Sequence, residues 1–430
     1  MLLNKIKKNI FEGTNPSIIT TKNILIFLIV ISLFFLLRTP DLVFQFGRFW
    51  AEEGERWFRV TQKSSTIEML TYAAKNDNIN MFFTNFIFAI VKFIPAKFAP
   101  LFTTVSAHFA SLICVIVILK NNFYFHIDSK LRYFISVLFF FSSSNHPEIW
   151  LNTINTMTYF GMIAPFLLFT NFNKISKKLF VFNLIFLFFV FSTSPYAMFL
   201  IPFFIIKYFL IKDSRSLYIM ILSLLIFTYQ FFIFLNFLEA DLINPKRLSV
   251  VKEFNIEMII YNFFKFLFYT TFGGNILAKL GHFSFYENLF FQIIMIILLM
   301  TLYIKLSFVS NHSLLFLLIA FYMSFMVMNF SFHGSLVGRY GSAQMFIIYS
   351  ALVIAYKQKK ELISRVILIF SLVAGIYYTL PINTTIKNIF LTGPAWFDEY
   401  KKWEVDNNYE PLYWNGNKKV GTNIYKIEDK

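Results

Sequence analysis

Charge and cysteine are both scarce in this sequence. Charged residues make up 14% of the 430 residues, whereas a soluble domain usually carries about 25%. The single cysteine, Cys114, excludes an intrachain disulfide and a cysteine-based metal site. The histidines form no i,i+4 pair or HExxH pattern, and no Walker or dinucleotide-binding fingerprint occurs. A histidine-based metal site and nucleotide chemistry are therefore not expected.

Long apolar runs dominate instead, and 57% of the residues are hydrophobic. A membrane-spanning helix needs about 20 apolar residues to cross a hydrocarbon core ~30 Å thick. The runs predict an all-α, polytopic transmembrane helix bundle with about eleven spans. The expected spans are residues 23–37, 101–119, 133–145, 157–170, 179–193, 197–211, 217–237, 288–306, 312–330, 341–356 and 364–380.

The basic residues predict which side each loop faces. A lysine-rich leader precedes the first run, which ends at Arg38 without a small-residue cleavage site, as in a retained signal-anchor. The positive-inside rule then places the N-terminus in the cytoplasm and the C-terminus on the outer side of the membrane. Residues 81–94 are short and carry Lys92. We interpret them as an interfacial helix on the outer side, because a span there would move the basic segment 120–132 outside. Residues 257–272 leave the same two alternatives.

All six tryptophans fall on segments expected outside, which are 38–100, 145–156, 238–287, 331–340 and the tail 381–430. An interfacial aromatic belt is one explanation, but a belt should occupy both membrane surfaces. The other explanation is a set of flat apolar platforms on which sugar rings stack.

The stretch "FGRFWAEEGERWF", residues 46–58, places two adjacent acids, Glu52 and Glu53, among aromatic residues. Apolar surroundings favour the protonated form of a carboxylate, which suits a general base. The flanking Arg48 and Arg56 oppose that effect and could hold an anion. The alternative is a solvated amphipathic helix with i,i+4 ion pairs such as Glu52–Arg56.

A second polar cluster occurs in "HPEIWLNTINTMTYF", residues 146–160. Glu148, Trp150, Asn152 and Asn155 gather where one expected helix ends and the next begins. If the segment is helical, the two asparagines share a face because they are three residues apart. The alternative is that their amides cap a helix end.

Two further features lie near helix ends. Arg339, followed by Tyr340, could extend its guanidinium to the membrane surface or bind a phosphate through two parallel hydrogen bonds. Pro195 is expected to open a helix, and Pro202 is expected to kink it.

Taken in order, five stretches of this sequence resemble bacterial GT-C integral-membrane glycosyltransferases. In that family an acidic pair in the first outer loop is the hallmark, often as Phe-Trp-Ala-Glu-Asp-Gly, and here Glu53 replaces the aspartate. The length, the basic leader and the outer tail are similar to those of serotype-converting O-antigen glucosyltransferases. The stretches are "FWAEEG", "EIWLNTIN", "SPYAMFLIP", "GRY" and "GPAWFDEYKKWE".

The resemblance implies transfer of a sugar, with glucose expected first, from a polyprenyl-phosphate donor to a lipid-linked glycan such as the O-antigen of lipopolysaccharide. The anomeric configuration would be inverted on the periplasmic face. Glu53 or Glu52 would be the general base, with Asp41 as a third candidate, and two adjacent acids could also bind Mg²⁺ or Mn²⁺. Partners would be membrane lipids, a donor synthase and a donor flippase, without nucleic acid.

The resemblance also implies two groups of binding residues. Arg339, Tyr340, Arg48 and Arg56 would bind the donor phosphate. The acceptor would contact Trp50, Glu148, Trp150, Asn152, Asn155, Trp396 and Trp403.

We expect a GT-C-like membrane module over residues 1–380, including the first outer loop 38–100, and a small extracytoplasmic tail over 381–430. One alternative function is a polysaccharide polymerase or ligase, which would rely on arginine-rich outer loops. Another is a non-catalytic transporter of lipid-linked sugars, which would need intramembrane charges or broken helices in repeated halves. A structural or receptor membrane protein is the third.

Overall fold

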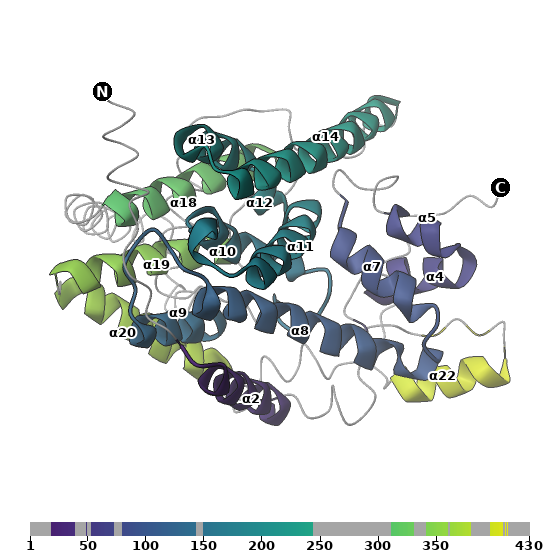
Figure 1. The fold of residues 1–430 in the computed structure, drawn as a ribbon. Coiled ribbons are helices and arrows are strands. Elements are labelled where there is room, and N and C mark those ends of the chain that lie inside the picture. The colour runs from purple at the N-terminus through teal and green to yellow at the C-terminus, as the bar shows by residue number, and fades with distance from the viewer. Residues whose placement is uncertain are drawn as a thin grey trace, which may run out of the picture.

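A computed structural model gives the fold, and its regular structure is helical (Figure 1). Within the part of the chain that it describes, there is no strand beyond one isolated bridge between Phe123 and Thr170. The predicted all-α class is therefore confirmed for these residues. The structure describes residues 19–38, 49, 53–72, 80–142, 149–243, 311–330, 341–359, 362–379, 396–406, 409 and 411.

Each expected apolar run within these residues coincides with a helix, whereas 257–272 and 288–306 lie outside them. In chain order the helices are α2 (Thr21–Arg38), the π-helix η1 (Glu53–Phe58), α4 (Arg59–Lys63), α5 (Thr66–Leu70), α7 (Phe82–Val91), the short 3-10 helix η2 (Ala96–Phe98), α8 (Ala99–Lys120), α9 (Ser129–Phe141), α10 (Thr156–Leu168), the 3-10 helix η4 (Phe172–Lys174), α11 (Lys177–Thr193), α12 (Pro195–Met198), α13 (Ile201–Ile211), α14 (Ser214–Ile243), α18 (Asn311–Phe330), α19 (Ser342–Lys359), α20 (Leu362–Thr379) and α22 (Trp396–Val405).

Two described helical stretches, Ala96–Lys120 and Ser214–Asn236, are long and apolar enough to cross a membrane. The helices Lys177–Thr193 and Pro195–Ile211 meet at a bend of 108° and together would form a third span. The 13-residue helices α9 and α10 are about 20 Å long, shorter than a ~30 Å hydrocarbon core. The described part of the chain therefore forms a helical bundle with two or three apolar spans, and about eleven spans for the whole chain remain a prediction.

The predicted kink at Pro202 is wrong. Ser194 accepts a hydrogen bond from the N–H of Ala197, and Pro195 is the first residue of α12. That helix ends after one turn at Met198, and Pro202 lies in the first turn of α13. Proline at a helix start loses no hydrogen bond, so Pro202 begins a new helix instead of bending an existing one.

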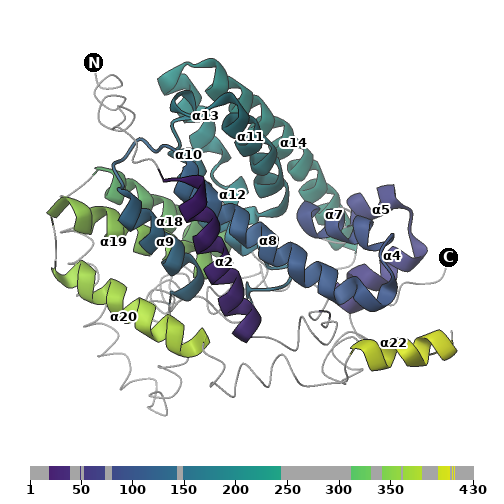
Figure 2. The same cartoon turned by 60° about the horizontal axis from the view of Figure 1, so that its bottom comes forward.

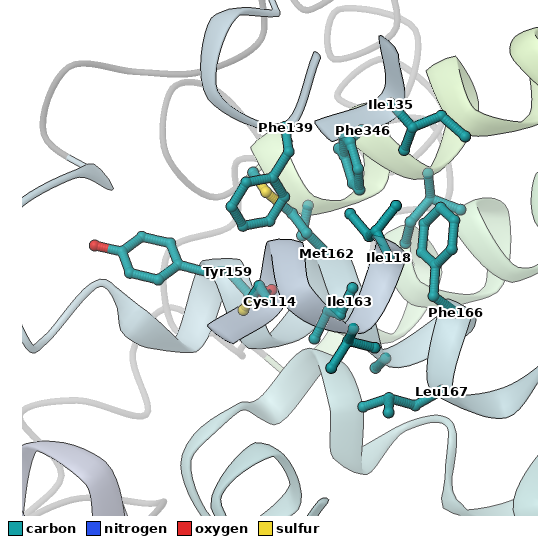
Figure 3. Close-up of a cluster of buried hydrophobic side chains, with 14 of the residues drawn as sticks. Cys114, Ile118, Ile135, Phe139, Tyr159, Met162, Ile163, Phe166, Leu167 and Phe346 are labelled. Carbon is teal, nitrogen blue, oxygen red and sulfur yellow. Dashed lines mark hydrogen bonds between the residues drawn. The ribbon is translucent and has the colours of Figure 1, made fainter. Parts of the chain in front are cut away.

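The main core lies where α8, α9, α10 and α19 meet, as Figure 3 shows. Phe139 packs edge-to-face on Phe346, with ring centroids 5.4 Å apart, while Ile118 and Phe166 are fully buried. Helix α2 lies against α8 and α9 on the outside of this core (Figure 2). The bundle is therefore built around α10, whose first turn carries part of the candidate site.

Large apolar side chains also cover the outward faces of several helices. A water-soluble protein rarely exposes contiguous apolar surface of this kind, whereas a membrane protein turns it toward lipid. The exposed side chains include Leu25, Ile29, Val30 and Leu33 on α2, Leu225, Phe227, Phe231 and Phe232 on α14, and Val366, Ile369 and Val373 on α20.

One end of the bundle gathers basic residues that bind backbone carbonyl groups. Arg132 donates to the carbonyl oxygens of Leu119 at 3.0 Å and Asn121 at 2.7 Å, beyond the last turn of α8. Lys207 donates to those of Leu168 at 2.7 Å and Thr170 at 2.8 Å, after α10. Unpaired carbonyl groups and the negative end of the helix dipole attract cations at a helix C-terminus. The loops predicted to be cytoplasmic therefore meet at this end, which we call the basic end.

Candidate functional site

Glu53 begins η1 at the opposite end of α8 from the basic end, and its side chain is only 1% exposed. Trp57 and Phe58, in the same helix, are equally buried. The alternative interpretation, a solvated amphipathic helix, is therefore wrong for these residues because they are buried, although their charges have helical spacing. The other two candidate bases, Glu52 and Asp41, lie outside the described residues.

The carboxylate of Glu53 binds Thr153, 100 residues further along the chain. Its Oε1 accepts hydrogen bonds from the backbone N–H and from the Oγ1 hydroxyl of Thr153, both at 2.6 Å. Hydrogen bonds to an ionised acceptor are short and about twice as strong as neutral ones. The structure thus joins the acidic stretch after the first helix to the stretch "EIWLNTIN".

Thr153 is itself fixed by two neighbouring helices. Its carbonyl oxygen accepts hydrogen bonds from the hydroxyls of Thr84 at 2.9 Å and Thr156 at 2.6 Å. Thr84 belongs to α7 and Thr156 begins α10. The position of the Glu53 carboxylate therefore depends on how α7 packs against the start of α10.

The prediction that Asn152 and Asn155 share a helical face is wrong. Both precede α10, which begins at Thr156. The Oδ1 of Asn152 accepts from the N–H of Asn155 at 2.9 Å, and its Nδ2 donates to the Trp150 carbonyl at 3.3 Å. Asparagine side chains compete with helix formation by binding nearby backbone groups, so the Asn152 amide holds the turn before α10. The N-cap residue of α10 is Asn155, which makes no side-chain capping hydrogen bond.

Leu151 adopts φ 65°, a left-handed conformation. A branched non-glycine side chain is strained in this region. The turn is nevertheless held by Tyr159, whose hydroxyl donates to the carbonyls of Ile149 and Asn152. Trp150 stacks on the Tyr159 ring at a centroid distance of 4.9 Å and an angle of 17°. The surrounding contacts therefore maintain a strained turn beside Glu53.

The tryptophans expected to stack on the acceptor are mostly covered by protein. Trp150 is 2% exposed and Trp396 is 1% exposed. Trp396 packs edge-to-face on Phe49 and Phe58, at 5.0 and 5.4 Å between centroids. Their ring faces are therefore used for packing in this structure, and Trp403 is only partly buried. Trp50 and Glu148 lie outside the described residues.

Among the expected phosphate-binding residues, only Arg56 is described. Its guanidinium carbon lies 4.8 Å from the centroid of the Trp57 ring and 5.8 Å from that of Tyr72. Cation–π contacts at these distances hold the side chain near the aromatic residues. The structure therefore places Arg56 on η1, three residues after Glu53, while Arg48, Arg339 and Tyr340 lie outside the described residues.

The sequence analysis missed a buried polar network behind Glu53. The indole N–H of Trp57 donates to Oδ1 of Asn85 at 2.9 Å, and Asn85 donates to Oδ1 of Asn80 at 2.8 Å. The N–H of Asn80 binds Gln230 at 3.0 Å, and Gln230 binds the Ser192 carbonyl at the same distance. Amides inside apolar runs were the available signal, because a buried amide needs hydrogen-bond partners. The network ties η1 and α7 to α11 and α14.

The described residues do not form a donor set suited to a divalent metal ion. No group of three or more His, Cys, Asp and Glu side chains comes together among them. The Oε1 of Glu53 already accepts two hydrogen bonds from Thr153. We therefore derive no chemical step through a metal.

Comparison of this chain with protein-family models, with curated proteins and with solved structures finds no match.

Proposed function

We propose that the protein is a GT-C-type glycosyltransferase that acts on the periplasmic face of a bacterial inner membrane. It transfers a sugar from a polyprenyl-phosphate donor to a lipid-linked or surface glycan, with inversion. The observation that carries the proposal is the buried Glu53 carboxylate, which is fixed on the turn before α10 by two hydrogen bonds from Thr153.

The location of Glu53 relative to the basic end supports an outward-facing site. Helix α8 runs from Ala99 near η2 to Lys120 at the basic end, a distance of about 33 Å. The positive-inside rule assigns the basic end to the cytoplasm. Glu53 then lies near the outer surface, where a flipped lipid-linked sugar would be presented.

The reaction needs one proton transfer and one substitution. Glu53 takes the proton from an acceptor hydroxyl, whose oxygen forms a bond to the anomeric carbon. The bond from that carbon to the donor phosphate oxygen breaks, and the oxygen keeps the electron pair. Polyprenyl phosphate leaves, and Arg56, on the same short helix as Glu53, supplies a positive charge that stabilises the developing negative charge. Because Glu53 is 1% exposed, the acceptor must displace covering side chains to reach it.

The test is transfer of radiolabelled sugar from polyprenyl-phosphate donors to lipid-linked glycan in membranes. Glu53→Gln keeps the shape of the side chain but cannot accept the proton, so we expect a rate loss of at least about a hundredfold. Glu52→Gln tests whether the adjacent acid is the general base instead. Asp398→Asn makes the same chemical change on an exposed residue of α22 and should remain within about twofold of wild type.

Four outcomes decide the proposal. Loss of transfer in Glu53→Gln, at wild-type expression and thermal stability, supports Glu53 as the base. Loss only in Glu52→Gln moves the base to the adjacent acid, and full activity in both variants excludes this site. If wild-type protein transfers no sugar from any donor but moves lipid-linked sugar across vesicle membranes, the transporter alternative replaces the enzyme.

A further inference from the structure

We propose that Thr153 is the positioning residue of the site: its hydroxyl orients the Glu53 carboxylate and keeps it ionised between catalytic cycles. This inference extends the proposed function and depends on Glu53 being the base. The sequence alone did not single out Thr153.

The geometry gives one oxygen of Glu53 two donors from one residue. The backbone N–H and the Oγ1 hydroxyl of Thr153 both lie 2.6 Å from Oε1. Two donors with different directions fix the rotation of the carboxylate as well as its position. Donors that bind a carboxylate also favour its charged form, which offsets the cost of burying Glu53.

The hydroxyl can be removed without disturbing the rest of the turn. The Thr153 carbonyl accepts from Thr84 and Thr156, and these two bonds do not involve its side chain. Valine has the shape of threonine and the same β-branching. Thr153→Val therefore deletes one donor to Glu53, while the backbone donor and both bonds to the carbonyl remain. Thr153→Ser restores the hydroxyl and removes only a methyl group.

Other titratable groups surround Glu53 and must be considered for a pH test. The tyrosine phenol on α10 interacts electrostatically with Glu53. The other groups are one further acid on η1, Glu55, and four basic residues. Tyrosine, lysine and arginine side chains ordinarily keep one charge state between about pH 5 and 8.5. If Thr153→Val shifts the acid limb of the pH–rate profile in this range, the shift therefore reports the carboxylate of Glu53. The groups on the elements around Glu53 are Glu55 and Arg56 on η1, Arg59 and Lys63 on α4, Lys92 after α7 and Tyr159 on α10.

The experiment measures kcat/KM for sugar transfer from pH 5 to 8.5 in membranes containing full-length protein. Hydrogen bonds to charged groups are strong enough that losing one should move the acid limb of Thr153→Val upward by about one pH unit. At pH values below the wild-type limb we expect a loss of up to about tenfold, which disappears at pH values above the limb of the variant. Thr153→Ser should keep the wild-type limb and lie within about threefold of the wild-type rate.

Thr84→Val is the matched control, because it removes a hydroxyl that binds the Thr153 carbonyl instead of Glu53. It can lower the rate through the position of the turn, but it should leave the limb in place. An unchanged limb in Thr153→Val, or equal loss in the serine and valine variants, would overturn the inference. If Glu53→Gln abolishes transfer in the same membranes, only the role of Thr153 fails. Full activity of Glu53→Gln removes Glu53 as the base of the proposed reaction, and the role of Thr153 fails with it.

Discussion

Trp396, on the last helix that the structure describes, donates its indole N–H to the carbonyl oxygen of Ala96, 300 residues earlier and 3.0 Å away. Its ring lies in the same buried cluster as Phe49, Trp57 and Phe58. The helix α22 therefore anchors the segment that carries Glu53. A tail that looks separate in the sequence contributes directly to the packing of the candidate site.

We predict that Trp396→Ala destabilises this region strongly. Truncating a buried tryptophan typically costs about 3–5 kcal/mol through lost packing and the remaining cavity. Trp396→Phe keeps most of the packing but loses the bond to Ala96, which should cost about 1 kcal/mol. Thermal unfolding in detergent and limited proteolysis near α22 measure both effects. Equal stability of the alanine variant and wild type would show that α22 does not anchor the Glu53 segment.

Leu151 offers a test of the strained turn. At φ 65° glycine is free of the steric penalty that any other residue meets, which is about 1 kcal/mol or more. Leu151→Gly should therefore be more stable than Leu151→Ala by about that amount, the reverse of the order in a helix. Both variants lose the same leucine packing, so their difference in unfolding free energy isolates the backbone conformation. A more stable alanine variant would contradict the left-handed turn.

Asp128 gives a pH-dependent prediction at the basic end. Its Oδ1 caps α9 by accepting from the N–H of Leu131 at 2.9 Å, and its Oδ2 binds Lys357 at 2.8 Å. Burial alone would raise the pKa of Asp128, but the bonds from Lys357 and Leu131 outweigh it, so the pKa lies below its ordinary value of 3.8. The ionised Asp128 side chain therefore stabilises the fold at pH values above its ordinary pKa, and this stabilisation disappears as the pH falls through its lower pKa in the folded protein.

Two variants of Asp128 separate the cap from the charge. Asp128→Ala should lose about 1 kcal/mol at pH 7 because the cap is gone. Asp128→Asn keeps a capping oxygen and should lose less, since a partly exposed ion pair contributes little. Urea unfolding at pH 7 and pH 3 measures these differences. The difference between wild type and Asp128→Asn should shrink at pH 3, and a difference that grows there would contradict the assignment.

The orientation of the bundle can be tested with reporter fusions. A reporter after Lys130, in the basic segment before most of α9, should report the cytoplasm. A reporter joined after Asp406, beyond α22, should report the periplasm. The ten-residue helix α7 is about 15 Å long and too short to cross a ~30 Å core alone, in line with an interfacial position. A periplasmic signal after Lys130 would reverse the sides assigned to the two ends.

The helices could be predicted from the sequence, because a long apolar run indicates a helix without any information about distant residues. The run 101–119, for example, became α8, Ala99–Lys120. Residues Glu53 and Asn152 were both expected on the outer side, and the structure brings their segments together. The bond from Thr153 to Glu53 could not be predicted, since no local pattern encodes contact between residues 100 positions apart. The short helix α12 was missed because the break after Met198 follows from packing as well as from Pro202.

The basic residues at the basic end form two groups, one buried and one exposed. Arg132 and Lys207 are 3% and 2% exposed and bind carbonyl oxygens, so they close the ends of helices and cannot reach lipid headgroups. Lys130 and Lys178 are exposed and can reach anionic phosphates at a bilayer surface. Counting all basic residues therefore overstates the electrostatic attraction of this end to a membrane. Neutralising the exposed lysines should weaken the attraction to the membrane while leaving the fold intact. Neutralising Arg132 or Lys207 should destabilise the fold while changing that attraction little.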